Sequence, residues 1–221
     1  MFAISERAAD SERVIHTTDT GLVAILRGIS PADVVAVGTA LAEEGFPAIE
    51  VPLNSPDPLR SIELLAAAVG SHCAVGAGTV TRVEDVARTE AAGARIIVAP
   101  NTDPEVIAEA VARGLTPYPG VATPTDAFTA LKAGASSLKL FPSDSLGIGG
   151  MKAIRAVLPA DVELLPVGGV DESNLAAWAT AGAGGAGIGS CLYRPGDSAD
   201  DVRARARVLV DIWRTARPSR V

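Results

Sequence analysis

Histidine and cysteine are scarce in this chain, which has two of each in 221 residues. Cys73 and Cys191 are far apart in the sequence, and His16 and His72 show no spacing typical of metal ligands. We therefore expect neither a disulfide framework nor a metal site. A serine or cysteine nucleophile activated by histidine would need one of the two histidines, and His16 lies in a polar segment.

Long apolar runs are also missing, since no stretch approaches the ~18 residues of a membrane-spanning helix. No charged and then apolar leader opens the sequence, so we expect a soluble, cytoplasmic protein. The net charge of −7 repels phosphodiester backbones and anionic membranes, and we expect no nucleic acid or membrane partner. A local cationic pocket for a single phosphate is compatible with this charge.

Lysine is rare as well, with three lysines in the chain. Lys132 and Lys152 lie in Ala-rich helical patterns, whereas Lys139 stands between Leu138 and Leu140 in a segment with the pattern of a strand. Burial of an ammonium group is costly unless it is paired or loses its proton. A neutral lysine can attack a carbonyl group to form a Schiff base. The alternative is a lysine whose stem packs in the strand while its charged end reaches solvent.

Short apolar strands and Ala-rich helices alternate from Leu22 onward, at intervals of 20 to 26 residues. Strands that are apolar on both faces, each followed by a helix, predict a parallel sheet covered by helices, and eight such units predict a (β/α)8 TIM barrel. An open doubly wound sheet is the alternative, but no GxGxxG motif marks a dinucleotide site. The predicted strands are 22–27, 48–53, 73–78, 95–100, 115–120, 137–142, 162–169 and 185–190.

The barrel accounts for a single domain at 21–221, and residues 1–20 are predicted to form a short N-terminal lead-in helix or arm. The chemistry of such barrels lies at the carboxyl ends of the strands. Glu50 interrupts an apolar strand as Lys139 does, so two ionisable side chains are expected to point into one barrel. A carboxylate near the amine could relay protons, directly or through a water. The alternative is a buried structural ion pair.

Glycine-rich segments end the last two predicted strands. Gly168 and Gly169, together with Gly189 and Ser190, indicate a phosphate cradle, because glycine lets backbone N–H groups approach an anion and the following helices present their amino ends. Tight turns also use glycine, so the pattern alone is not specific.

Two further strand ends carry polar side chains. Arg27 could clamp a carboxylate or phosphate, or could pair with Glu50. Thr79 could donate to a substrate carboxylate, or could cap the helix that follows it.

Long motifs at these positions resemble the class I aldolases of 2-keto-3-deoxy-6-phosphosugar acids. The resemblance runs from residue 22 to residue 196 and is closest to the branch that acts on 2-dehydro-3-deoxy-6-phosphogalactonate. The motifs that carry it are IEVPLNSP at 49–56, VGAGTV at 75–80, LKLFPS at 138–143, PVGGV at 166–170 and GAGIGSCLYR at 185–194.

The resemblance implies a homotrimer without metal or cofactor, which cleaves a phosphorylated 2-keto-3-deoxy sugar acid to pyruvate and D-glyceraldehyde 3-phosphate. It implies Lys139 as the Schiff-base lysine and Glu50 as the proton carrier. It also implies a substrate-binding set with pyruvyl contacts at Arg27 and Thr79, a pocket wall at Pro100 and Phe141, and phosphate contacts at Gly168, Gly169, Gly189 and Ser190.

Two departures separate this sequence from the phosphogluconate-cleaving relatives: Asn54 stands where they carry arginine, and Val167 stands where they carry threonine. Both favour the galactonate branch; the alternative within the family is a 2-dehydro-3-deoxy-6-phosphogluconate or 4-hydroxy-2-oxoglutarate aldolase. Two other classes fit a phosphate-binding barrel: a phosphosugar isomerase or epimerase that forms no imine, which the scarcity of histidine disfavours, and a non-catalytic sugar-phosphate-binding barrel.

Overall fold

Strands and helices alternate along residues 21–217, the part of the chain that the computed structural model describes. The lead-in helix predicted for residues 1–20 lies outside the described residues, so the division at residue 20 stays a prediction. The strands are β1 Leu22–Ile25, β2 Ala48–Pro52, β3 Ala74–Gly78, β4 Ile96–Val98, β5 Thr116–Tyr118, β6 Gly120–Val121, β7 Ser137–Leu140, β8 Glu163–Pro166 and β9 Ala186–Ile188. The helices are α1 Val34–Glu43, α2 Pro58–Val69, α3 Val83–Ala91, α4 Pro104–Ala112, α5 Pro124–Lys132, α6 Ser143–Arg155, α7 Leu175–Thr180 and α8 Ala199–Ala216.

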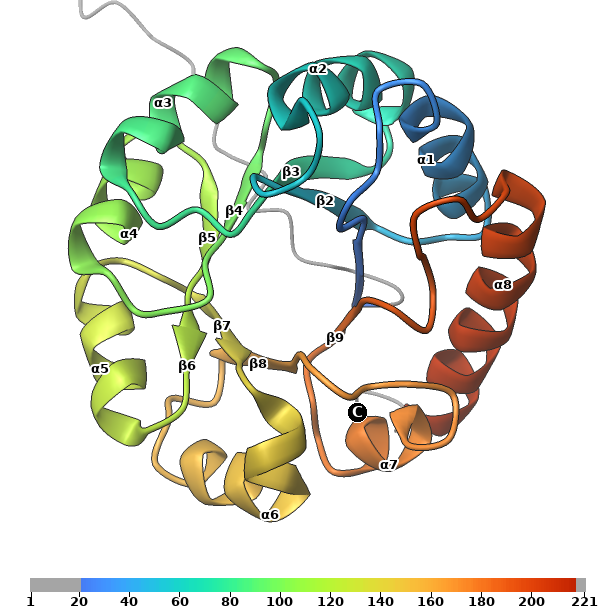
Figure 1. Ribbon diagram of the computed structural model, residues 1–221. Helices are drawn as coiled ribbons and strands as arrows, with labels where there is room; N and C mark the ends of the chain where they lie inside the picture. Colours follow the sequence, from blue (N-terminus) through green and yellow to red (C-terminus); the bar gives the residue numbers. More distant parts are fainter. Residues whose placement is uncertain (1–20, 218–221) are drawn as a thin grey trace, which may run out of the picture.

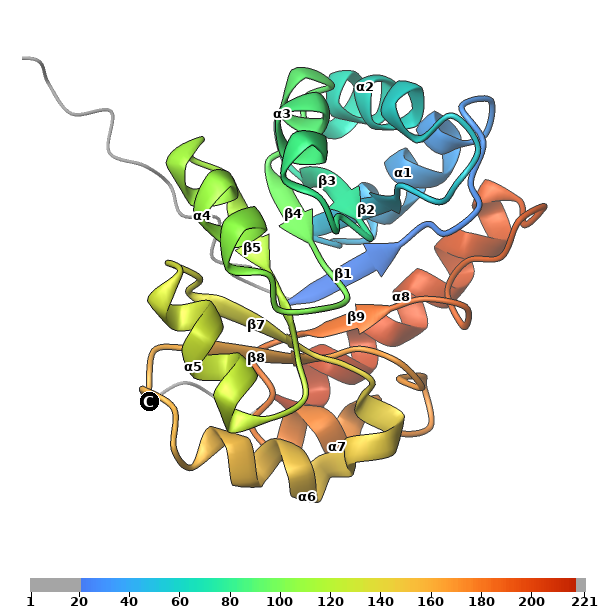
Figure 2. The ribbon, with the colours of Figure 1, turned by 60° about the vertical axis from the view of Figure 1, so that its left-hand side comes forward.

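Parallel strands form a ring, and the helices surround it (Figure 1). One sheet has the order β5-β4-β3-β2-β1-β9 and the other has the order β6-β7-β8. A bridge between Val167 and Gly187 joins β8 to β9, and β5 runs into β6 through Pro119, so the two sheets close on each other. The predicted (β/α)8 barrel is therefore confirmed. Figure 2 shows the ring from the side, with helices outside the strands.

The predicted strand 115–120 is wrong in one respect, because it is divided into β5 and β6 at Pro119. Tyr118 pairs with Val98 of β4, whereas Gly120 pairs with Lys139 of β7. Pro119 faces β7, because its carbonyl oxygen accepts a hydrogen bond of 2.9 Å from the Lys139 backbone N–H. Proline has no N–H group to add to the ladder on that side, so the regular strand is interrupted at this residue.

Helix starts follow from local sequence. Proline occupies the first turn of α2, α4 and α5, where a missing N–H group costs nothing. Thr123 caps α5 and forms a capping box with Asp126, and Asp103 and Ser198 cap α4 and α8. These caps fix where the loops at the carboxyl ends of the strands give way to helix.

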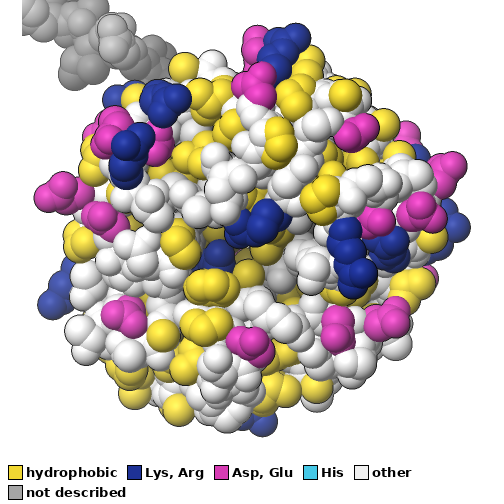
Figure 3. Space-filling view, viewed as in Figure 1, with side chains coloured by type: hydrophobic (Ala, Val, Ile, Leu, Met, Phe, Trp, Pro, Cys, Tyr) yellow, Lys and Arg dark blue, Asp and Glu magenta, His cyan; other side chains and the backbone are white. Residues whose placement is uncertain are grey.

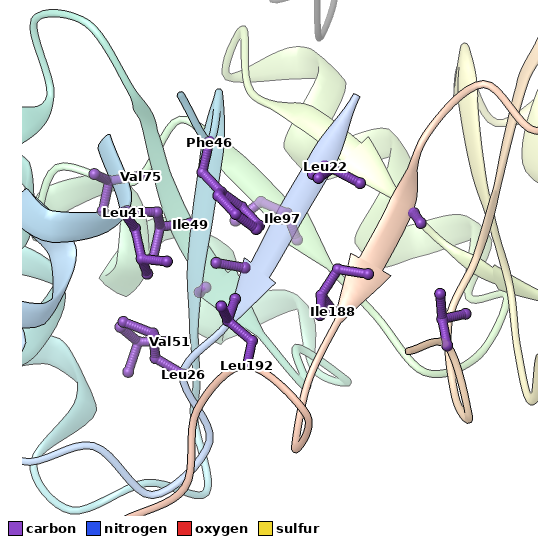
Figure 4. Close-up of a cluster of buried hydrophobic side chains, with 14 of the residues drawn as sticks. Leu22, Leu26, Leu41, Phe46, Ile49, Val51, Val75, Ile97, Ile188 and Leu192 are labelled. Carbon is purple, nitrogen blue, oxygen red and sulfur yellow. The ribbon is translucent and has the colours of Figure 1, made fainter. Parts of the chain in front are cut away.

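Apolar side chains form two separate layers. The larger layer lies between the strands and the surrounding helices, and Figure 4 shows part of it around β1 and β2, including Leu41 of α1, Phe46 and Ile49. The smaller layer fills the barrel interior and includes Val23, Ala48, Ala74, Ile96, Val98, Tyr118 and Leu165. Side chains two residues apart on a strand share a face, so Glu50 points inward with Ala48.

The first strand and the last helix of the barrel meet at one place. Gly21, which precedes β1, lies against the buried indole of Trp213 near the end of α8. On the outside, Glu44 accepts hydrogen bonds from Arg207 at 2.8 and 3.1 Å, which ties the end of α1 to α8. Within residues 21–217, none of the helices combines the length and the apolar character needed to cross a bilayer.

Candidate active site

A cavity of about 280 Å³ opens at the carboxyl ends of the strands. On the corresponding face of the molecule, Lys and Arg side chains gather at the centre, where the surface is hollowed (Figure 3). All ten candidate site residues named from the sequence line this one cavity: Arg27, Glu50, Thr79, Pro100, Lys139, Phe141, Gly168, Gly169, Gly189 and Ser190.

Glu50 lies on β2 inside the barrel and is 2% exposed. Its Oε2 atom is buried and has no hydrogen-bond partner among the described residues. Burial raises the pKa of this carboxyl from 4.5 to about 7, against the attraction of the Lys139 and Arg27 cations. A carboxyl group with this pKa can both accept and donate a proton near neutral pH.

Lys139 lies on β7 and is 7% exposed. Burial lowers the pKa of its ammonium group, the nearby Glu50 carboxylate opposes that change, and Arg27 adds to it. The Nζ atom lies 4.7 Å from the centroid of the Phe141 ring. The lysine does not reach bulk solvent as a snorkelling side chain would, and its lowered pKa increases the fraction of the neutral, nucleophilic form.

Glu50 and Lys139 do not form a direct ion pair within residues 21–217. Both nevertheless line the same cavity and influence each other's pKa. A structural role as a paired salt bridge between two strands therefore does not describe them. A carboxyl group that lines the same cavity as an amine can exchange protons with a molecule bound to that amine.

Arg27 and Thr79 flank this pair. The Arg27 Nη1 atom donates a 2.6 Å hydrogen bond to Asn54 Oδ1, so its hydrogen-bonded partner is Asn54, not Glu50. Thr79 has a left-handed backbone with φ 58°, which is unusual for a β-branched residue. The possible role of Thr79 as a helix cap is wrong, because Arg82 is the residue that precedes α3. Strained backbone of this kind is concentrated at functional sites.

The glycine-rich rim is held by side chains at the starts of two helices, α6 and α7. Gly168 and Gly169 have φ values of 99° and 70°, which only glycine adopts readily. Ser143 Oγ donates to the Gly168 carbonyl at 2.6 Å, and Asn174 Nδ2 donates to the Gly169 carbonyl at 2.7 Å. These two hydrogen bonds hold the backbone of Gly168 and Gly169 in one conformation.

The opposite part of the rim is a single helical turn. The Gly189 carbonyl accepts from the N–H groups of Leu192 and Tyr193 at 2.9 and 3.1 Å. The first N–H groups of such a turn, at Ser190 and Cys191, have no partner within it and suit an anion. The expectation that the following helices present their amino ends here is wrong for α8, which begins nine residues after Ser190.

Val167, which the sequence analysis singled out, also lines the cavity. Sequence reasoning missed five further lining residues: Ile25, Val170, Asp171, Gly187 and Cys191. Strand alternation could have identified Ile25, which lies two residues before Arg27. No sequence pattern marked Asp171 or Cys191. No group of three or more His, Cys, Asp and Glu side chains in residues 21–217 is arranged to hold a metal ion.

A closed barrel with a desolvated lysine and a separate carboxyl group at its carboxyl-end mouth is an arrangement typical of barrel enzymes. The chain belongs to the KDPG and KHG aldolase family, whose model matches residues 15–205. It is therefore an aldolase, a carbon–carbon lyase, and the resemblance seen in the sequence is confirmed.

Two curated relatives are particularly similar. The chain is 47% identical to the 2-dehydro-3-deoxy-6-phosphogalactonate aldolase of Escherichia coli (strain K12), over 90% of this chain and 97% of that protein. It is 52% identical to a probable 2-dehydro-3-deoxy-6-phosphogalactonate aldolase of Rhizobium meliloti (strain 1021), over 84% of this chain and 87% of that protein. A solved structure described as native KDPGal is 47% identical, with a TM-score of 0.87 over 88% of this chain and 95% of the other.

The phosphogluconate aldolases are more distant. The 2-dehydro-3-deoxy-phosphogluconate aldolase of Treponema pallidum (strain Nichols) is 35% identical over 65% of this chain and 68% of that protein. The chain is thus more similar to these phosphogalactonate aldolases than to this phosphogluconate aldolase, which agrees with the prediction made from Asn54 and Val167.

Proposed function

We propose that this chain cleaves 2-dehydro-3-deoxy-6-phosphogalactonate to pyruvate and D-glyceraldehyde 3-phosphate. The specific substrate follows from the relatives at 47–52% identity, which carry that name. The observation that carries the chemistry is Lys139, a lysine buried at the mouth of the barrel with a lowered pKa and no ion-pair partner within 21–217.

In the proposed reaction, the neutral Lys139 Nζ attacks the C2 ketone, and loss of water from the carbinolamine gives a cationic imine. Glu50 takes the proton of the C4 hydroxyl, directly or through a water. The C3–C4 bond breaks, its electron pair moves into the imine to form an enamine, and the aldehyde leaves. Glu50 returns a proton to C3, and water hydrolyses the imine to release pyruvate and regenerate the lysine.

The residues that line the cavity could orient such a substrate. Arg27 and Thr79 would bind the C1 carboxylate of the pyruvyl part, and Pro100 and Phe141 would form walls beside the lysine. The C6 phosphate would reach the glycine rim of Gly168, Gly169, Gly189 and Ser190. Assembly as a homotrimer and a cytoplasmic location stay predictions from the resemblance.

Reduction with borohydride in the presence of pyruvate tests the imine. We expect one reduced pyruvyl adduct, located on Lys139 by peptide mapping, and no adduct in Lys139→Met. Lys152→Met is the matched control, because this exposed lysine of α6 lies outside the cavity and its loss should leave the adduct in place. A folded protein that forms no adduct in excess pyruvate would exclude imine chemistry.

The substrate itself is tested by comparing kcat/KM for the two C4 epimers. We expect a higher value for the phosphogalactonate epimer than for the phosphogluconate epimer. The opposite preference, with imine formation intact, would retain the mechanism and replace the substrate.

A further inference from the structure

Gly78, the last residue of β3, leaves a space that the Glu50 carboxyl group fills. A Cβ atom at residue 78 would lie 1.8 Å from Glu50 Oε2, 2.3 Å from Cδ and 2.5 Å from Oε1. Atoms that are not bonded cannot approach so closely, so no other residue fits while Glu50 keeps its place. The carboxyl group packs directly on the β3 backbone.

The position of the Glu50 carboxyl group relative to β2 and β3 shows the direction in which the side chain extends. Strands β2 and β3 lie side by side (Figure 1), and the backbone register pairs Glu50 with Gly76. The carboxyl group nevertheless lies over Gly78, two residues closer to the carboxyl ends of the strands. The Glu50 side chain therefore leans along the strand toward the cavity mouth.

Backbone conformation does not explain the glycine. Gly78 is not among the glycines with a positive φ, so residues with side chains could adopt its conformation. Gly76 of the same strand differs, because a Cβ there would meet the Ile96 carbonyl oxygen at 2.2 Å, a contact between strand backbones. At Gly78 the three atoms nearest to such a Cβ all belong to the one carboxyl group in the cavity.

We propose that Gly78 is a positioning residue for the aldol cleavage: its missing side chain seats the Glu50 carboxyl group where it can exchange protons with the substrate on Lys139. This inference rests on the proposed function. It adds a residue that does not line the cavity and that acts only through Glu50.

The first experiment measures turnover of Gly78→Ala. The added methyl group displaces the carboxyl group, and we expect kcat to fall by about 100-fold, within the range that a positioned acid–base group supplies. KM should change little, and the limb of the pH–rate profile that Glu50→Gln abolishes should shift. Gly149→Ala is the control, since a Cβ there meets open space on α6, and it should retain full turnover.

A cycle of melting temperatures separates positioning from general damage. We expect Gly78→Ala to lower Tm while Glu50 is present and to leave Tm unchanged when Glu50→Ala has emptied the space. The double variant also remains foldable if Gly78→Ala alone does not fold. An equal loss of Tm in both backgrounds, or wild-type kcat and pH profile in Gly78→Ala, would overturn the inference.

The Tm cycle needs no substrate, so it tests the seat of Glu50 independently of the reaction. Borohydride trapping of pyruvate on the wild-type chain tests the proposed function separately. If the pyruvyl adduct forms but the Tm effect of Gly78→Ala does not depend on Glu50, only the role of Gly78 is refuted. If the Tm effect depends on Glu50 but no adduct forms, only the imine chemistry is refuted.

Discussion

Replacing Glu50 with Gln should change how the stability of the protein depends on pH. The pKa of the Glu50 carboxyl rises from 4.5 to about 7 on folding because the group is buried. Between these two values the folded state binds a proton that the unfolded state releases, so the stabilising contribution is fully present below 4.5. It is lost as the pH rises through about 7.

The size of the effect follows from the two pKa values. Between about pH 5.5 and about pH 8, a carboxyl group with this shift removes about 2 kcal/mol from the free energy of unfolding. Glutamine has the same shape and no titration, so Glu50→Gln should gain about 2 kcal/mol relative to wild type over this interval. Groups that titrate equally in both proteins cancel in the difference.

Urea unfolding followed by tryptophan fluorescence measures this difference, since Trp178 and Trp213 are both buried. Lys139→Met provides a second check: without the ammonium group, the pKa of Glu50 should rise further, and the loss of stability should extend to higher pH. A free-energy difference between wild type and Glu50→Gln that is equal at the two pH values would refute the reasoning.

Three further predictions concern other parts of the fold. Asn54→Ala removes the acceptor of the 2.6 Å hydrogen bond from Arg27; steady-state kinetics should show KM rising up to about tenfold, and an unchanged KM would contradict the role of this pair. Thr79→Gly relieves the left-handed backbone at φ 58°, so the free energy of unfolding should rise by about 1 kcal/mol while turnover falls; lower stability in urea unfolding would be the contrary result. Leu41→Ala empties a fully buried site on α1 and should cost about 2–5 kcal/mol in the same assay, whereas Val157→Ala, at a side chain 53% exposed, should stay within about 0.5 kcal/mol; equal costs would argue against this view of the core.

The sequence predicted the two ionisable residues of the site because apolar strands make a lone charge conspicuous. Lys139 and Glu50 are the only ionisable residues in their predicted strands, 137–142 and 48–53, and the same alternation placed both inside the barrel. The division of 115–120 at Pro119 was not predicted, because hydrophobic pattern does not report which neighbour a strand pairs with.

Other features depend on distances between residues that are remote in the sequence. Nothing in the order of residues indicated that Asn54 accepts from Arg27, or that Gly78 leaves room for Glu50. The turn at Gly189 was expected as a glycine-rich anion site, but the distance to α8 was not foreseen, because helix starts are set by local caps such as Ser198.

The meeting of Gly21 with Trp213 has a consequence for rearranging the chain. Because β1 begins and α8 ends beside each other at the amino ends of the strands, a short linker between residues 21 and 216 would close the barrel into a covalent circle. New termini could then be opened in a helix-to-strand loop on that same face. Such a circular permutant would keep every strand-to-helix loop intact, so the order of the units along the polypeptide could change while the catalytic mouth did not.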